Sequence, residues 1–174
     1  MTDRIMLDIE TLGTEPGCAI VAIGACRFDT RHVGQTFEAS VDLESNGEAG
    51  LNIDHETLSW WLTQDKQARE QLTGGYRLGE ALDRLDAFVE DADEIWANSP
   101  TFDCEILAAG YEAVGMDLPW HYWQLRDFRT LQELDIDEPT DHEGVEHDAV
   151  DDAVYQATVA ASVLGTIEEV SGDD

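Results

Sequence analysis

Two carboxylates near the amino terminus, Asp8 and Glu10, have the spacing of a metal-binding pair. They lie in the segment RIMLDIE, residues 4–10, whose alternating apolar residues predict a strand over residues 5–10. Side chains two positions apart on a strand point to the same face, so the two carboxylates lie side by side. Adjacent carboxylates repel each other unless a cation lies between them, and oxygen ligands suit Mg²⁺ or Mn²⁺. The alternative is a solvated strand edge in an acidic protein.

A third carboxylate, Asp103, follows the short apolar segment 94–97, which we interpret as a strand. The residues after it show helical spacing, so Asp103 is expected in the first turn of a helix, close to the carboxyl end of the strand. Ligand sites of open α/β sheets form at that place. The alternative interpretation is an aspartate that complements the helix dipole.

The carboxyl-terminal third contains His147 and Asp152, at the start of a helical pattern. A histidine beside carboxylates can accept a proton near neutral pH. The alternative is an exposed histidine in an acidic loop, which is our interpretation of His142. We treat Asp148 and Asp151 as coincidental, because aspartate is frequent throughout this chain.

The order of the expected elements indicates a mixed α/β fold, with three strands first and then helices alternating with two further strands. The three leading strands are joined by short turns, which favours an antiparallel meander. We predict a polar loop over 45–52, one domain over residues 1–170, and a frayed acidic tail over 171–174. Strands are expected over 5–10, 19–28, 36–43, 94–97 and 122–128, and helices over 54–62, 78–89, 102–114, 130–134 and 150–164.

The composition is extremely acidic. The 174 residues carry a formal net charge of −30, with one lysine, Lys66, among nine basic residues, while 43% apolar residues suffice for a folded core. Such a charge opposes docking on phosphate backbones in dilute salt. One explanation is a cytoplasm with molar salt, where the Debye length falls to about 3 Å; the other is a protein that mimics nucleic acid. The scarcity of lysine favours the first, since it resembles proteins of salt-loving archaea and their viruses.

The three cysteines, Cys18, Cys26 and Cys104, form no C-x-x-C pair. Neither a disulfide framework nor a zinc site is indicated, and a reducing intracellular compartment is expected. No apolar segment approaches the length of a membrane span, and the amino terminus has no apolar signal region. We therefore expect a cytoplasmic protein with no membrane partner.

Three short motifs occur in order along the chain: D-x-E-T at residues 8–11, N-x₃-F-D at 98–103 and H-x₄-D at 147–152. Together they resemble the DEDD exonucleases of the ribonuclease H-like fold, in the DEDDh subgroup, which has a catalytic histidine. The other subgroup carries a tyrosine four positions before the last aspartate, and Asp148 occupies that position here. The resemblance implies a mixed five-stranded sheet, three antiparallel strands followed by two parallel ones, flanked by helices.

A closer resemblance rests on segments outside the motifs. Residues 54–62 with their Trp-Trp pair, WHYW at 120–123 and RDFRT at 126–130 are similar to the small single-domain exoribonucleases of the mycobacterial type and to the exonuclease VIII-like domains of phages and bacteria. That branch removes nucleotides from the 3′ end of nucleic acid. The resemblance covers most of the chain, and the expected partner is therefore a 3′ end of RNA or single-stranded DNA, with nucleoside monophosphates as products.

The resemblance also assigns roles to individual residues. Two divalent cations, Mg²⁺ or Mn²⁺, would be held by four carboxylates, and His147 would be the general base toward the attacking water. Trp61 is a candidate stacking platform for a base, with core packing as its alternative, and Arg129 is a candidate phosphate contact, with a surface salt bridge as its alternative. The metal ligands would be Asp8, Glu10, Asp103 and Asp152. The residues beside the substrate would be Thr11, Leu12, Gly13, Asn98 and Phe102.

Two rival functions are compatible with the sequence. A catalytically inactive or nucleic-acid-mimicking binding protein on the same fold would explain the charge but not the three ordered motifs. An enzyme on the same scaffold that acts on DNA ends or very short oligonucleotides would retain the motifs. We also allow for a homodimer.

Overall fold

The computed structural model describes residues 2–134 and 147–172. Within these residues, five strands form one sheet in the order β3-β2-β1-β4-β5. The strands are β1 (Arg4–Thr11), β2 (Ile20–Phe28), β3 (Val33–Ser40), β4 (Glu94–Ala97) and β5 (Leu125–Asp127). The helices are α1 (Leu43–Glu48), α2 (His55–Trp61), α3 (Lys66–Glu70), α4 (Leu78–Val89), α5 (Asp103–Val114), α6 (Arg129–Gln132) and α7 (Ala149–Gly172), with a 3₁₀ turn at Tyr122–Gln124.

The strand directions confirm the predicted sheet. β1 pairs with β2, and β2 with β3, in antiparallel orientation, whereas β1 with β4 and β4 with β5 pair in parallel. Because β1 and β4 run the same way, their carboxyl ends meet at one edge of the sheet. This edge therefore receives the residues that follow each of these two strands, as we expected for a ligand site.

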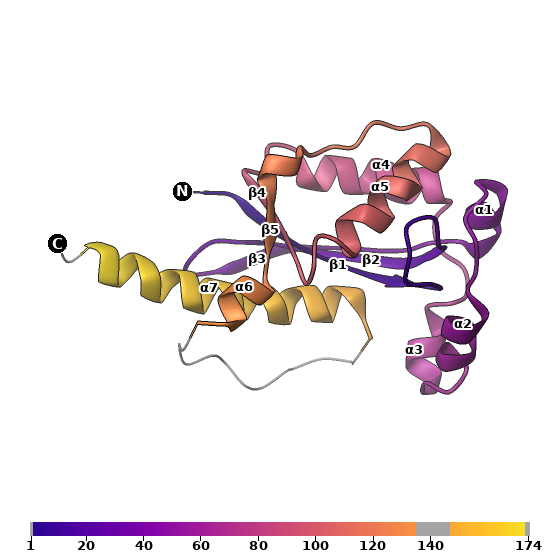
Figure 1. The fold of residues 1–174 in the computed structure, drawn as a ribbon, viewed down its shortest axis with the longest axis horizontal. Coiled ribbons are helices and arrows are strands. Elements are labelled where there is room, and N and C mark those ends of the chain that lie inside the picture. The colour runs from indigo at the N-terminus through magenta and orange to yellow at the C-terminus, as the bar shows by residue number, and fades with distance from the viewer. Residues whose placement is uncertain (1, 135–146, 173–174) are drawn as a thin grey trace.

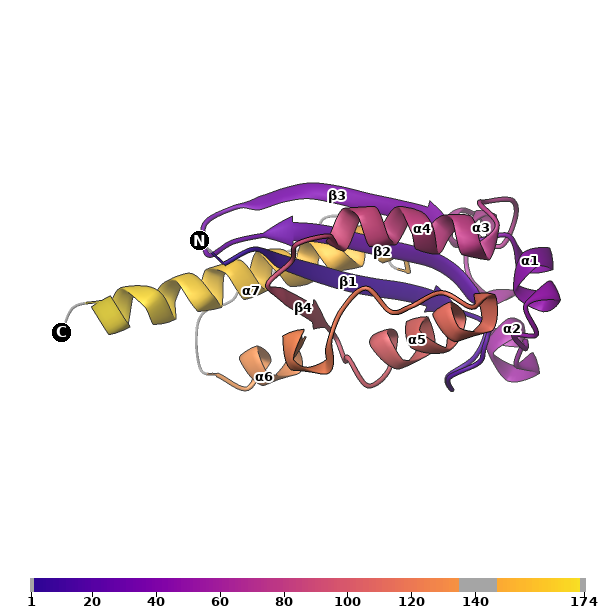
Figure 2. The same cartoon turned by 90° about the horizontal axis from the view of Figure 1, so that it is seen from above.

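Helices cover both faces of the sheet, as Figures 1 and 2 show: α4 and α5 pack on one face, α6 and α7 on the other. The alternation along β1 distributes its side chains between these layers. Ile5, Leu7 and Ile9 join the core beneath α4 and α5, while Met6 joins the core beneath α7. Asp8 follows Met6 at a spacing of two and so faces α7. The period-two pattern of the sequence thus fixes which helix the carboxylates meet.

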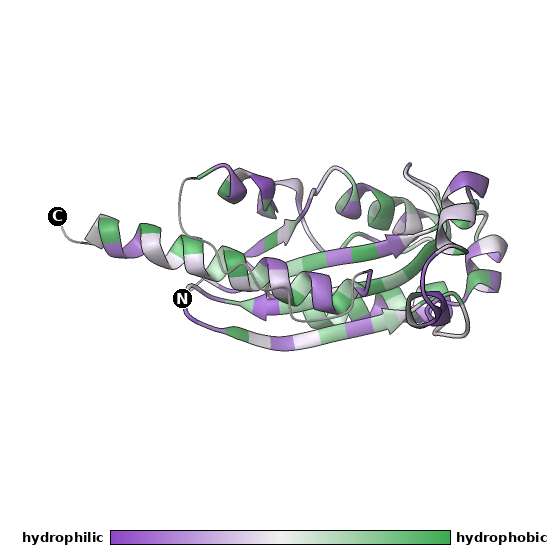
Figure 3. Cartoon of the chain, turned by 90° about the horizontal axis from the view of Figure 1, so that it is seen from below, coloured by the Kyte–Doolittle hydropathy of each residue, from purple (hydrophilic) through white to green (hydrophobic). Residues whose placement is uncertain are grey.

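The helix α7 is long, and Figure 3 shows hydrophobic and hydrophilic residues interspersed along it. Several of its buried side chains are small: Ala153, Ala157 and Ala160 are all fully buried. Small residues let the helix axis lie close to the strands. None of the described helices combines the length and the apolar character needed to cross a bilayer.

The structure differs from the sequence-based expectation in the connections. A helix, α1, occupies the first half of the predicted polar loop, because the Asp42 side chain accepts a hydrogen bond from Ser45 N at 2.8 Å and caps it. Asn46 fixes this helix to the sheet by bonding both main-chain groups of Ile20. The last strand is shorter than predicted, because a 3₁₀ turn replaces its first half. The final helix continues to Gly172, two residues into the predicted tail.

Candidate active site

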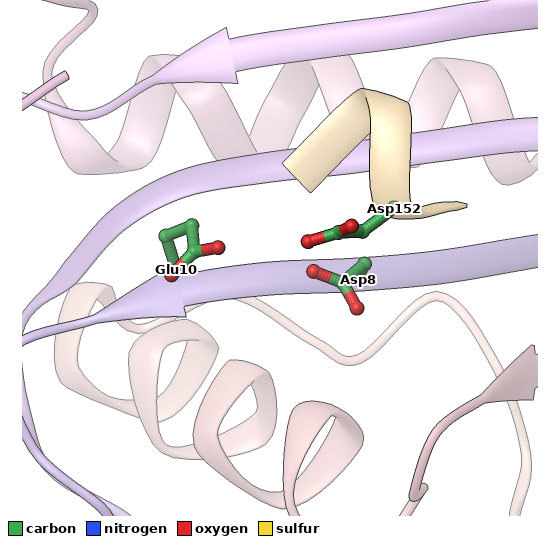
Figure 4. Close-up of side chains that lie close together, drawn as sticks. All are labelled: Asp8, Glu10 and Asp152. Carbon is green, nitrogen blue, oxygen red and sulfur yellow. The ribbon is translucent and has the colours of Figure 1, made fainter. Parts of the chain in front are cut away.

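Three carboxylates converge where β1 passes beneath the first turn of α7. Asp8 and Glu10 come from β1 and Asp152 from α7, and one oxygen of each lies within 4.8 Å of those of the other two. Figure 4 shows the three groups together between the strand and the helix. Residues 144 positions apart in the chain thus meet, as the sequence predicted. Two cations bound about 3.5–4 Å apart need shared ligands, and Asp8 and Asp152 are close enough to share them.

A glycine makes this meeting sterically feasible. Gly24 on β2 lies directly opposite Asp8 in the antiparallel pair. A Cβ atom at Gly24 would lie 2.1 Å from the carbonyl of Ala149, the first residue of α7. Only a residue without a side chain lets the helix begin this close to the sheet. Asp152 follows within the same turn, so its carboxylate reaches the strand.

The fourth predicted ligand, Asp103, begins α5, as expected from the sequence. Its side chain is buried, with 3% of the residue exposed, and its Oδ2 has no hydrogen-bond partner among the described residues. Asp103 is close enough to Asp8 for its charge to raise the Asp8 pKa. A buried carboxylate oxygen without a partner is unfavourable unless a cation or water satisfies it.

Burial and mutual repulsion raise the pKa of three of these groups. Desolvation is the largest cause for each. The pKa of Asp8 lies well above its ordinary value, with Asp103 adding repulsion and a hydrogen bond from Gln156 opposing the shift. The pKa of Glu10 rises to about 8, with Asp152 as the next contributor, and that of Asp103 rises to about 7, opposed by backbone hydrogen bonds. Without a cation the cluster favours protons, as expected for carboxylates gathered without a counter-ion.

The raised pKa of Glu10 predicts that the metal-free protein loses stability as the pH rises. Below pH 4.5, Glu10 is protonated both folded and unfolded; between 4.5 and about 8 the unfolded chain releases the proton while the folded protein keeps it. The free energy of unfolding therefore falls, by at most about 1.4 kcal/mol per pH unit for one retained proton. Melting temperatures in EDTA, from pH 5 to 8.5 at constant ionic strength, should fall less steeply in Glu10→Gln. Equal slopes in both proteins would contradict it.

His147 stands beside this cluster in a constrained backbone conformation, with a φ of +64°. Gln71 donates a hydrogen bond from Nε2 to the His147 carbonyl at 2.6 Å, and the Trp60 ring meets the imidazole edge-on with 4.8 Å between centroids. Both contacts come from the α2–α3 region. The histidine opens onto a cleft of about 480 Å³, lined by Asp8, Asn98, Phe128, Gln132, His147, Asp152, Tyr155 and Gln156.

The two tryptophans of α2 divide their roles differently from our expectation. Trp61 is 1% exposed and donates from Nε1 to the Thr11 carbonyl at 2.9 Å, so it is a core residue and cannot stack on a base. Trp60 is 41% exposed and contacts His147. Adjacent residues on a helix point about 100° apart, so only one of the two tryptophans can face the core. The sequence of so short a segment does not show which one does.

The other predicted substrate residues occupy varied positions. Thr11 and Leu12 have buried side chains, so only their main chain can face a ligand, and Gly13 is pressed against Cys18. Arg129 forms a two-point ion pair with Asp127, with Nη2 to Oδ2 at 2.6 Å, which is the surface salt bridge that we considered as its alternative.

Asn98 is exposed and lines the cleft, in agreement with its predicted place. Phe102 is half-buried and packs against the core beneath α4 and α5. His142 lies outside the described residues.

Sequence reasoning missed two glutamines of the site. Gln156 donates to Asp8, and Gln71 holds the His147 main chain. Gln156 carried a usable signal, since it follows Asp152 by four positions on a helix and interrupts an alanine-rich buried face. Gln71 carried none, because its contact depends on how α3 folds back toward the start of α7.

The comparison with protein families decides the assignment. The family model described as the 3'-5' exoribonuclease Rv2179c-like domain matches residues 3–164. The chain belongs to this family. The Rv2179c-like assignment confirms the resemblance to the 3'-5' exonucleases that the motifs indicated.

Solved structures share the fold of this Rv2179c-like domain at low sequence identity. Cell-death related nuclease 4 (CRN-4) has a TM-score of 0.68 and 11% identity over 95% of this chain and 64% of its own. The nuclease domain of 3'hExo, a DEDDh family member bound to rAMP, has a TM-score of 0.64 and 13% identity over 94% of this chain and 92% of its own. E. coli Exonuclease I in complex with a 5cy-dT13 oligonucleotide has a TM-score of 0.64 and 18% identity over 98% of this chain and 42% of its own.

These likenesses confirm the ribonuclease H-like exonuclease fold. The Rv2179c-like chain spans about two thirds of CRN-4 and less than half of Exonuclease I. A search of curated proteins by sequence gave no match.

The residues of the cluster fit divalent cations, which DEDDh exonucleases use. The donor atoms are all oxygens, as hard cations require. Two buried oxygens, Asp103 Oδ2 and Gln156 Oε1, have no hydrogen-bond partner within the described part of the chain. The pKa values of Asp8 and Glu10 are raised first by desolvation and then by the charges of neighbouring carboxylates. A cation would relieve both conditions.

Proposed function

We propose that the protein is a metal-dependent 3'-5' exonuclease that releases nucleoside monophosphates from the 3′ ends of RNA or single-stranded DNA. The observation that carries this proposal is the convergence of Asp8, Glu10 and Asp152 at the carboxyl end of β1, in a chain that belongs to an exoribonuclease family. RNA is the first candidate, because the description of the family names that substrate class.

The four carboxylates Asp8, Glu10, Asp103 and Asp152 would hold two divalent cations, Mg²⁺ or Mn²⁺. When bound, such cations activate water and neutralise charge that develops on a phosphodiester. Four negative side chains and two dications roughly cancel, which leaves a site that can accept a phosphate. Asp8 and Glu10 are anchored on a central strand and Asp152 on a packed helix, so their spacing is rigid without a ligand.

His147 would be the general base. It lines the same cleft as Asp8 and Asp152, and it is only half-buried, so part of the residue is accessible to solvent. The edge-on contact with Trp60 limits the orientations of the imidazole. Trp60, rather than Trp61, is the aromatic group that an incoming 3′ nucleotide would meet.

We also propose that the protein works in the cytoplasm of a salt-loving archaeon, either as a protein of that host or as a protein of its virus. The chain has nine cations to offer a polyanion against 39 acidic residues. In dilute buffer this field repels nucleic acid, whereas at 1 M salt charges are screened within about 3 Å. Binding would then depend on contacts inside the cleft.

A homodimer is also part of this proposal.

The decisive experiment measures 3′-nucleotide release from labelled RNA, single-stranded DNA and duplex DNA with saturating Mn²⁺ or Mg²⁺, from dilute buffer to 1 M KCl. We expect release that needs the divalent cation at every salt concentration, with a rate that persists or increases with KCl, and a melting temperature that rises in parallel. Nucleic-acid binding driven by cation release would weaken instead.

Each contrary result has its own meaning. The absence of release under all conditions would favour the inactive or mimic protein. Release confined to dilute buffer, together with a melting temperature that falls with KCl, would support the proposed exonuclease activity but contradict the proposed high-salt environment. Preference for DNA ends or for very short oligonucleotides would replace RNA as the substrate.

A further inference from the structure

A buried glutamine contacts the carboxylate cluster from the second turn of α7. Gln156 lies one turn beyond Asp152 and is only 6% exposed. Its Nε2 donates a hydrogen bond to Asp8 Oδ1 at 2.8 Å. This is a contact between α7 and β1 that does not depend on the carboxylates being protonated, because an amide keeps its hydrogens at every accessible pH.

The other end of the same amide has no partner among the described residues. Gln156 Oε1 is fully buried and accepts no hydrogen bond within the described residues. Gln156 also lines the cleft that contains Asp8, Asp152 and His147. A buried amide oxygen without a hydrogen-bond partner is unfavourable. A cation or water molecule bound in the cleft would satisfy it.

Packing alone does not account for a glutamine here. Its neighbours on the buried side of α7 are all apolar and belong to one core: Ala153, Ala157, Val159 and Ala160. An apolar side chain of the same length would fill the same space and leave no oxygen unsatisfied. The glutamine instead places an amide beside the cleft, with its Nε2 bonded to Asp8.

We propose that Gln156 is a positioning residue that raises the affinity of the carboxylate site for divalent cations, fixing Asp8 through Nε2 and offering Oε1 to the cation or its hydration shell. The proposal rests on the metal-dependent function proposed above. The hydrogen bond to Oδ1 restricts rotation of the Asp8 carboxylate and leaves Oδ2 directed elsewhere. Groups that orient metal ligands in this way typically contribute about 10- to 100-fold in metal affinity.

The test is Gln156→Met, which preserves length and packing but removes both amide atoms. Protein freed of metal with EDTA and dialysed is titrated with Mn²⁺ alone, at constant KCl and without nucleic acid. Apparent dissociation constants are measured by calorimetry and by the rise in melting temperature. We expect the Mn²⁺ dissociation constant of the variant to increase about tenfold or more, whatever its metal-free melting temperature.

The matched control is Val163→Ala, a buried position on the same helix two turns further along, in the same core. It should lower the melting temperature with and without Mn²⁺ and leave the dissociation constant unchanged. If Gln156→Met behaves like Val163→Ala, or binds Mn²⁺ as the wild type does, Gln156 is only a packing residue. A wild-type protein that binds no Mn²⁺ would overturn the proposed function itself, which is a distinguishable result.

Discussion

Replacing Asp8 with asparagine is expected to reduce 3′-nucleotide release by more than about 100-fold, while the metal-free protein melts at a higher temperature than the wild type. Residues that only orient metal ligands already cost about 10- to 100-fold when removed, so a direct ligand should exceed that range. The asparagine keeps the size of the side chain and an oxygen that can still accept the hydrogen bond from Gln156.

The gain in stability has an electrostatic cause. Asp8 is largely removed from water and is repelled by Asp103, Asp152 and Glu10, all of which raise its pKa. A neutral amide at this position removes these repulsions without opening a cavity. The rate should be measured at saturating Mn²⁺ and the melting temperature in EDTA at pH 8, where the remaining carboxylates are most ionised.

Asp151→Asn is the matched control for this prediction. Asp151 immediately precedes Asp152 in the first turn of α7 but is not among the clustered carboxylates. The same chemical change there should leave the rate of release near that of the wild type. A rate for Asp8→Asn within a few-fold of the wild type would remove Asp8 from the metal site, whatever the melting temperature does.

The parts of this site that follow short periodic rules could be predicted from the sequence. The period of two along β1 places Asp8 and Glu10 on one face, and the structure has them there. Asp103 was expected in the first turn of a helix because the apolar spacing changes from strand-like to helical just before it, and it begins α5. Parallel pairing of β1 with β4 then brings both segments to one edge.

Features that depend on the distance between elements could not be predicted. The phase of the short helix α2 decides that Trp61 is buried and Trp60 faces His147, and no local pattern sets that phase. Residues 45–48 resemble a loop until Asn46 is seen to bond the main chain of Ile20, a contact 26 positions away that stabilises the helix. Gly24 looks like any strand glycine until α7 is placed on it.

Gly24 therefore provides the second large prediction: Gly24→Ala should lower the rate of 3′-nucleotide release by about 100-fold and destabilise the protein by about 1–3 kcal/mol. The added Cβ would lie 2.1 Å from the Ala149 carbonyl, and Cβ contacts below 3.0 Å essentially never occur, so the start of α7 must move relative to β2 by at least 0.9 Å. Asp152 moves with it, away from Asp8 and Glu10, and a displacement of about 1 Å is enough for a loss of this size.

Gly79→Ala is the control for this substitution. Gly79 lies in the first turn of α4 with no atom within 4 Å of an added Cβ, so the same methyl group should leave release unchanged and stabilise the helix by up to about 1 kcal/mol. Release and urea-induced unfolding are measured for both variants, together with the rise in melting temperature on adding Mn²⁺. If Gly24→Ala lost stability but kept the Mn²⁺-induced rise and the rate, the metal site would tolerate movement of α7. The close approach of helix and sheet would then serve the core alone.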